Sequence, residues 1–182
     1  MSVEAEKTGP NDAGPAQDQG MIICVADLNP FAEASRRRRE ENRELRDETP
    51  LRFAFVGRCS TEDYQDPATS KTWQLQKAQS LVSSVGGKIV REYFDIGESR
   101  SVPWASRPES GRFLEDAARV ERLFDALVVG EGQRCFYDRQ FGDIQAVLMK
   151  LGMEVWVPEL GGAYDPENPT HHTIMAVMGP IS

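Results

Sequence analysis

The sequence predicts an α/β fold, a three-layer domain with a mainly parallel sheet of four or more strands. Short apolar runs alternate with longer segments in which apolar residues recur at helical spacing throughout residues 51–182. This alternation indicates right-handed βαβ units with helices on both faces of one sheet. Polar loops with arginine and serine follow several of the apolar runs, which is where ligands bind in open parallel sheets.

Residues 1–50 are expected to form a mostly disordered extension that contains a charged helix. Residues 1–20 are rich in Gly, Pro, Asp and Gln and lack periodicity, so they bury too little surface to offset chain entropy. Residues 31–48 hold four consecutive arginines followed by mixed charges. Their acids favour a salt-bridged surface helix over a basic arm that touches nucleic-acid phosphates. Pro50 marks the boundary with the domain at 51–182.

Short runs of apolar residues predict four strands, at residues 53–56, 88–94, 124–129 and 153–157. The first is an unbroken apolar run, as is typical of a parallel strand buried on both faces. The second alternates between apolar and polar residues, and the third is almost wholly apolar. Gly57 is expected to end the first of them, and Asp95 closes the second.

The expected helices lie between these strands and show apolar residues on one face. They are residues 67–85, 109–122, 140–151 and a last helix that opens at about residue 170. Trp73 is placed on the inward face of the first helix, Val120 on that of the second and Val147 on that of the third.

Composition excludes several classes of protein. The net charge of −8 counts against a free-standing nucleic-acid binder. The domain itself is also acidic, because residues 1–50 and 51–182 each carry a net charge of −4. No window of about 18 apolar residues predicts a membrane span. The cysteines are three in number and lack metal-ligand spacing, which indicates free thiols in a reducing cytoplasm. Adjacent His171 and His172 fit a loop or helix start better than a metal site.

The polar residues after the first strand are the main candidates for chemistry. Ser60 follows Arg58 by two residues, which suggests a nucleophile beside a phosphate-binding cation. Residues 56–67 read Val-Gly-Arg-Cys-Ser-Thr-Glu-Asp-Tyr-Gln-Asp-Pro. This stretch closely resembles the Arg-Val-Ser-Thr-x-x-Gln signature of serine recombinases, the resolvase/invertase and large serine integrase group.

Three further landmarks of that family follow in the right order. They are Phe-Asp-Ile-Gly-Glu-Ser-Arg-Ser at 94–101, Ser-Arg-Pro at 106–108 and Trp-Val-Pro-Glu-Leu-Gly-Gly at 156–162. The resemblance covers the chain from about Leu51 and implies a resolvase-like catalytic domain. No Gly-x-Gly-x-x-Gly or Walker motif follows any strand, which argues against another class of nucleotide-binding α/β domain.

The resemblance implies a reaction without metal or cofactor. A serine hydroxyl attacks a DNA phosphodiester and leaves a 5′-phosphoserine linkage and a free 3′-hydroxyl. Arginines suit the charge-rich transition state, because each binds two phosphate oxygens and stays charged. By their match to the family pattern, the implied catalytic residues are Ser60, Arg58, Arg107, Arg134, Asp95 and Gln74.

Four of these six residues have an ordinary structural alternative. Ser60 would otherwise cap a turn or a helix. Gln74 would be a surface glutamine, since the loop before it differs in length from the family's. Arg107 and Arg134 would be surface arginines.

The chain departs from the family pattern in two places. The family reads Asp-Arg-x-x-Arg after the third strand, whereas this chain has Gln133 and Tyr137 in place of the carboxylate and the second arginine. Glu131 and Arg139 are nearby charges that would compensate. The domain is also expected to be truncated in its last helix, without the DNA-binding region that follows in the family.

Two functions of different class therefore remain. The first is a site-specific DNA recombinase catalytic domain of a mobile element, which binds DNA weakly without an additional DNA-binding domain and forms a homodimer or tetramer in a full-length context. The second is a truncated, non-catalytic binding module that pairs with a full-length recombinase or another protein. Neither interpretation involves a membrane.

Overall fold

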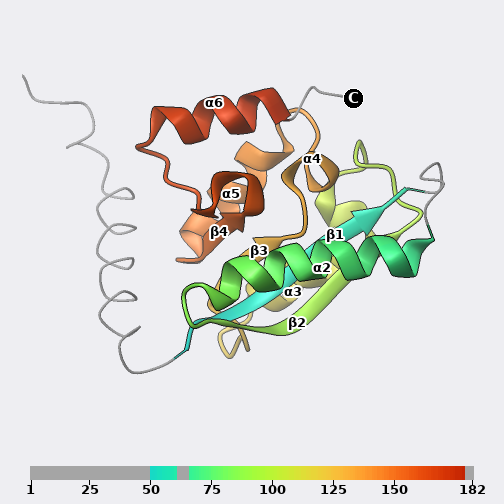
Figure 1. Cartoon of the computed structure of the whole chain (residues 1–182), viewed down its shortest axis with the longest axis horizontal. Helices are drawn as coiled ribbons and strands as arrows, with labels where there is room; N and C mark the ends of the chain where they lie inside the picture. Colours follow the sequence, from blue (N-terminus) through green and yellow to red (C-terminus); the bar gives the residue numbers. More distant parts are fainter. Residues whose placement is uncertain (1–49, 61–65, 179–182) are drawn as a thin grey trace, which may run out of the picture.

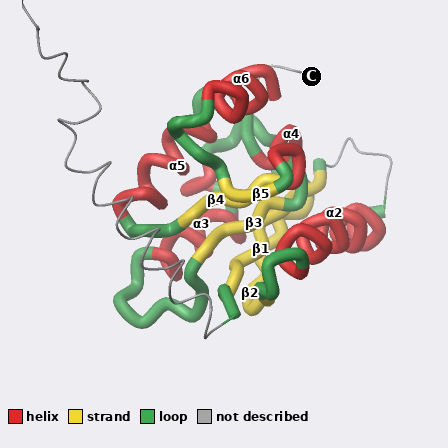
Figure 2. Tube along the Cα trace, turned by 60° about the vertical axis from the view of Figure 1, so that its left-hand side comes forward, coloured by secondary structure: helices red, strands yellow, loops and turns green. Residues whose placement is uncertain are grey.

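The computed structural model describes residues 50–60 and 66–178, and the predicted extension at 1–49 and the end of the chain at 179–182 lie outside this part. Five strands form one sheet between layers of helices (Figures 1 and 2). In chain order the elements are β1 Arg52–Cys59, α2 Pro67–Ser83, β2 Lys88–Ile96, η3 Trp104–Ser106, α3 Pro108–Ala117, β3 Ala126–Val129, α4 Gly132–Cys135, α5 Gln140–Lys150, β4 Glu154–Val157, η4 Pro158–Leu160, β5 Gly162–Ala163 and α6 Pro169–Met178.

The sheet has the strand order β2-β1-β3-β4-β5. The first four strands are parallel, and the two-residue β5 runs antiparallel to β4. β1 is an inner strand, with β2 on one side and β3 on the other. Arg58 of β1 lies opposite Asp95 of β2, so the carboxyl ends of these two strands meet at one edge. The predicted three-layer, mainly parallel α/β fold is confirmed.

Alternate residues of β1 serve two separate cores. Phe53 and Phe55 are fully buried and pack towards α2, together with Ala78 and Val82 of that helix. Ala54 and Val56 face the opposite core, to which α3, α5 and α6 contribute (Figure 2). Burial on both faces explains why β1 reads as a continuous apolar run.

The first strand continues past Gly57, which was expected to end it. A Cβ atom at Gly57 would lie 2.8 Å from the Phe55 ring and 2.9 Å from the Gln74 side chain. Glycine stands here because the side chain of α2 approaches the strand closely, and the strand keeps pairing with β2 as far as Cys59.

Three apolar residues predicted to face inward are exposed. Trp73 is 47% exposed because the next residue, Gln74, takes the buried position on α2. Val120 is fully exposed, since α3 ends at Ala117 and not at residue 122. Val147 is 45% exposed, because Ile144 and Leu148 form the inward face of α5. No helix in the described part of the chain has the length and apolarity needed to cross a membrane.

Candidate active site

Ser60 directly follows β1 at the sheet edge where several polar residues gather. It is half-buried, and the main chain beside it is fixed because Gly97 donates a hydrogen bond to the Cys59 carbonyl at 2.9 Å. Arg58 and Asp95 lie next to each other across β1 and β2. The structure therefore places Arg58, Ser60 and Asp95 at one edge, the carboxyl end of the two strands.

Gln74 joins this edge from α2. Its Oε1 atom accepts from the Arg58 amide at 3.4 Å, and its Nε2 atom donates to the Arg58 carbonyl at 2.9 Å. β3 ends at Val129, opposite Val56, so no strand residue pairs with Arg58 on that side. The fully buried Gln74 amide supplies the two missing hydrogen bonds of the ladder.

The Arg58 side chain turns away from the strand and binds the loop after β2 and the helix α4. Its Nε donates to the Glu98 carbonyl at 3.0 Å, and its Nη1 donates to the Arg134 carbonyl at 2.9 Å. The residue is 6% exposed. Arg58 thus fixes the loop after β2 against α4, and its charge lies at the carboxyl end of β1, which Ser60 follows.

Three arginines donate to three consecutive carbonyls of α4. Arg100 binds the Gln133 carbonyl at 3.1 Å, Arg58 binds that of Arg134, and Arg107 binds that of Cys135 at 3.0 Å. Carbonyls in the last turn of a helix lack helical partners and carry partial negative charge, which suits cationic donors. α4 therefore gathers three guanidinium groups at one end of the sheet.

Arg107 is the most deeply buried member of this group, at 2% exposed. Besides the Cys135 carbonyl, it donates to the carbonyls of Val102 and Arg100 and to the side chain of Gln140. Burial lowers the pKa of Arg107, and the neighbouring charge of Arg58 acts in the same direction. Through these hydrogen bonds, Arg107 connects the loop after β2 with α4 and α5.

Asp95 uses both carboxylate oxygens to cap α3. Oδ1 accepts from the Glu109 amide at 2.7 Å, and Oδ2 accepts from the amide and the hydroxyl of Ser110. Such contacts satisfy amides that have no partner within the helix. Asp95 is 1% exposed, so its role in this structure is to anchor α3 to the end of β2.

Arg134 lines a cavity of about 360 Å³ that is also lined by Asp66, Thr69 and Trp73. Its Nε lies 2.7 Å from a carboxylate oxygen of Glu131. Since Arg58 binds the Arg134 main chain, the cavity adjoins the arginine cluster. This cavity combines a cation of the predicted site with an exposed aromatic ring.

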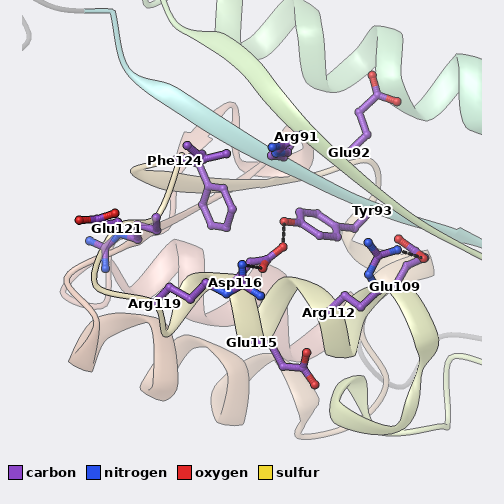
Figure 3. Close-up of a pocket in the computed structure, with 12 residues that line it drawn as sticks. Arg91, Glu92, Tyr93, Glu109, Arg112, Glu115, Asp116, Arg119, Glu121 and Phe124 are labelled. Atoms are coloured by element: carbon purple, nitrogen blue, oxygen red, sulfur yellow. Dashed lines mark hydrogen bonds and ion pairs between the residues drawn. The ribbon is translucent and has the colours of Figure 1, made fainter.

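A second cavity, of about 400 Å³, lies between β2 and α3 and contains none of the predicted site residues (Figure 3). Tyr93 donates to Asp116 at 2.7 Å in this cavity, and Asp116 also pairs with Arg119. Charges of both signs line its wall, as Figure 3 shows. Glu109 also pairs with Arg112 in its wall, and we assign this cavity no chemistry.

The two positions that depart from the family pattern both contact Arg100. The Gln133 carbonyl accepts from this arginine, and the Tyr137 ring, which is 40% exposed, lies under its guanidinium at 5.3 Å from the centroid. A cation from the loop after β2 therefore covers Tyr137.

Sequence reasoning did not assign Arg100, Lys77 or Glu131 to the site. Arg100 lies within the quoted 94–101 landmark, and Lys77 lies one helical turn after Gln74. Glu131 was noted only as a nearby charge, although it lies two residues after the end of β3.

Comparison with known proteins gives matches among solved structures only, since neither a family model nor a curated protein sequence matches this chain. The N-terminal catalytic domain of TP901-1 integrase superposes with a TM-score of 0.55 at 17% identity, covering 70% of this chain and 90% of that one. A resolvase family site-specific recombinase from Streptococcus pneumoniae gives 0.52 at 15% identity, with 70% and 83% covered. The chain therefore has the α/β fold of serine recombinase catalytic domains.

Proposed function

We propose that residues 51–182 form a serine recombinase catalytic domain, which cleaves and exchanges DNA strands through a 5′-phosphoserine intermediate. The observation that carries this proposal is the convergence of Arg58, Arg100 and Arg107 on α4 at the strand end that bears Ser60. Cations gathered at the strand end that bears a hydroxyl suit the attack of that hydroxyl on a phosphodiester. The fold shared with two recombinases supports the same function.

In the proposed reaction, the Ser60 hydroxyl oxygen attacks the phosphorus atom of the scissile phosphodiester. A bond forms between Oγ and phosphorus, and the bond between phosphorus and the 3′ oxygen breaks. Ser60 gives up its proton, and the departing 3′ oxygen takes one up. The reverse reaction, with the 3′-hydroxyl of another strand, completes the exchange and restores the serine. No oxidant or reductant is consumed.

The other residues have distinct roles in this proposal. Arg134 contacts the phosphate from the cavity wall, and Arg58 and Arg107 supply positive potential from beneath it. Gln74 fixes the main chain two residues before the nucleophile. Asp95 anchors α3 to the end of β2, beside Arg58.

The DNA affinity of the domain is proposed to be weak. Residues 51–182 carry a net charge of −4, so few cations are available to release counterions from DNA. We therefore propose that the main DNA affinity resides outside this domain and that strand exchange takes place in a dimer or tetramer.

One observation favours the alternative of a non-catalytic module that pairs with another protein. Arg58 and Arg107 bind main-chain carbonyls, so their contacts also serve to hold loops in place. A chain that had lost its chemistry would keep this framework.

The experiment that separates the two functions needs no knowledge of the target site. The full chain is incubated with a library of nicked duplexes of randomised sequence, in which cleavage is irreversible because the short fragment that ends in the free 3′-hydroxyl diffuses away. DNA that remains bound to protein after denaturation is recovered and sequenced. The catalytic proposal predicts covalent recovery of an enriched sequence, whereas the alternative predicts none above a Ser60→Ala control.

A further inference from the structure

Glu131 lies between two cations from different parts of the fold. One carboxylate oxygen is 3.0 Å from Lys77 Nζ of α2, and the other is 2.7 Å from Arg134 Nε of α4. The Glu131 side chain is 15% exposed, which makes it the most buried member of the group. Charge-assisted hydrogen bonds in such a setting hold their partners in defined geometry.

The local sequence brings these three residues together. Gly130 allows α2 to approach, since a Cβ atom there would lie 2.6 Å from the Cβ of Gln74. Lys77 follows Gln74 by one helical turn and therefore reaches the residue after Gly130. Lys77 Nζ also lies 3.7 Å from the centroid of the Trp73 ring, so the lysine is fixed from two sides.

Lys77 and Arg134 share the Glu131 carboxylate, and Asp66 is a further carboxylate in the wall of the cavity that Arg134 lines. The contact at Nε sets the plane of the guanidinium, and the anchor on Lys77 prevents the Glu131 carboxylate from following a rotation of Arg134. Glu131 therefore orients Arg134 beside this cavity.

We propose that Glu131, anchored by Lys77, is a positioning residue that aims the Arg134 guanidinium at the scissile phosphate. The inference rests on the proposed function, which gives Arg134 its phosphate contact. Glu131 does not touch the substrate and acts through Arg134. Neutralising Glu131 removes the orientation but also removes a negative charge, so the rate should fall while the affinity for DNA stays equal or rises.

The test compares Glu131→Gln with wild type in the full chain. The first readout is the Nε–H resonance of Arg134, identified by its loss in Arg134→Lys, whose exchange with water reports the ion pair without any DNA. The other two readouts are the affinity for DNA recovered from the randomised library and the rate of covalent adduct formation on that DNA. Glu92→Gln is the matched control, because Glu92 pairs at 3.0 Å with Lys71, which lies on α2 like Lys77.

In Glu131→Gln, Nε–H exchange should accelerate about tenfold or more, as expected when a charge-assisted hydrogen bond is lost. DNA affinity should stay equal or rise, because one negative charge is gone. Adduct formation should slow by about tenfold or more, the usual loss when the partner that orients a functional group is removed. Glu92→Gln should leave all three readouts at the wild-type level.

Three results would overturn the proposal. Unchanged Nε–H exchange would mean that Glu131 does not hold Arg134. A parallel fall of affinity and rate would indicate a merely structural role, and a parallel rise would indicate that Glu131 competes with the phosphate. If Glu131→Gln does not fold, Lys77→Met removes the carboxylate's other anchor and should accelerate the same exchange. The Nε readout stands even if no DNA is ever cleaved, so it fails separately from the proposed function.

Discussion

The side-chain amide of Gln74 binds both main-chain polar groups of Arg58, the residue two positions before Ser60. A helix side chain thus completes the β ladder at the point where the neighbouring strand has ended. The same amide accounts for two glycines, because Cβ atoms at Gly57 and Gly130 would lie 2.9 Å and 2.7 Å from its oxygen. The conformation of the candidate nucleophile therefore depends on the packing of α2.

Replacing Gln74 by alanine should destabilise the protein by about 2 kcal/mol, because it leaves a buried amide and a buried carbonyl of Arg58 without partners. Gln79→Ala on the exposed side of the same helix is the control, and it should change the free energy of unfolding by less than about 0.5 kcal/mol. Denaturant unfolding of both variants measures the difference. Equal effects at the two positions would show that the Gln74 contacts carry no special weight.

Gly130→Ala should also destabilise the protein, by about 1–3 kcal/mol, since the added methyl group overlaps the Gln74 side chain. Gly142→Ala is expected to act in the opposite direction. It lies in α5 with no atom within 4 Å of the added Cβ, and alanine is favoured over glycine there by up to about 1 kcal/mol. Melting temperatures of the two variants should move apart, and a stabilising Gly130→Ala would contradict the close approach of α2.

The ion pair between Arg52 and Asp125 predicts a pH dependence of stability. Burial of Asp125 alone would raise its pKa, but the hydrogen bonds and charge of Arg52 outweigh it and lower the pKa. A lowered folded pKa gives stability that is complete above the unfolded value of about 3.9 and is lost as pH falls through the folded pKa.

Asp125→Asn should therefore be less stable than wild type at neutral pH, by about 1 kcal/mol at most because the pair is partly exposed. The difference should shrink towards zero at pH values below about 3.9. Unfolding curves for both proteins at a series of pH values measure it. A difference that persists unchanged in acid would rule out the ion pair as its cause.

The weak DNA affinity proposed for the domain can be measured by fluorescence anisotropy with duplex DNA at physiological salt. We expect no sequence-specific binding tighter than about micromolar from this chain alone, since its net charge of −8 opposes association with a polyanion. Sub-micromolar, sequence-specific binding would refute the proposal that the main affinity lies elsewhere.

The sheet was predictable because β1 and β3 are buried on both faces and read as separate apolar runs, while β2 alternates between apolar and polar residues. The placement of Arg58, Ser60 and Asp95 at one edge was predictable for a related reason, as carboxyl ends of neighbouring parallel strands meet. The prediction that Trp73 faces inward was wrong, because it rested on the aromatic ring of Trp73 being more apolar than the side chain of Gln74. Gln74 takes that position only because two glycines, distant in sequence, leave room beside main-chain groups that need partners.

The arginine cluster on α4 could not be predicted from side-chain patterns. Its acceptors are the main-chain carbonyls of residues 133–135. Every residue has such a carbonyl, so the amino-acid types at these positions do not mark them as acceptors. The grouping of Lys77, Glu131 and Arg134 depends equally on the distance between α2 and α4. Such sites become visible only when the packing of helices on the sheet is known.

Peptide mass spectrometry of the protein–DNA adduct shows whether Ser60 becomes covalently linked to DNA. Adducts from the randomised library are digested with nuclease and protease, and the peptide that carries Ser60 is sequenced. We predict a nucleotide remnant joined through its 5′ phosphate to Ser60, formed equally well with EDTA and abolished in Ser60→Ala. Arg58→Lys should reduce its yield severely, because lysine cannot make the two-pronged contacts of a guanidinium. A metal-dependent nick without attached protein, unchanged in Ser60→Ala, would rule out cleavage through a phosphoserine at Ser60.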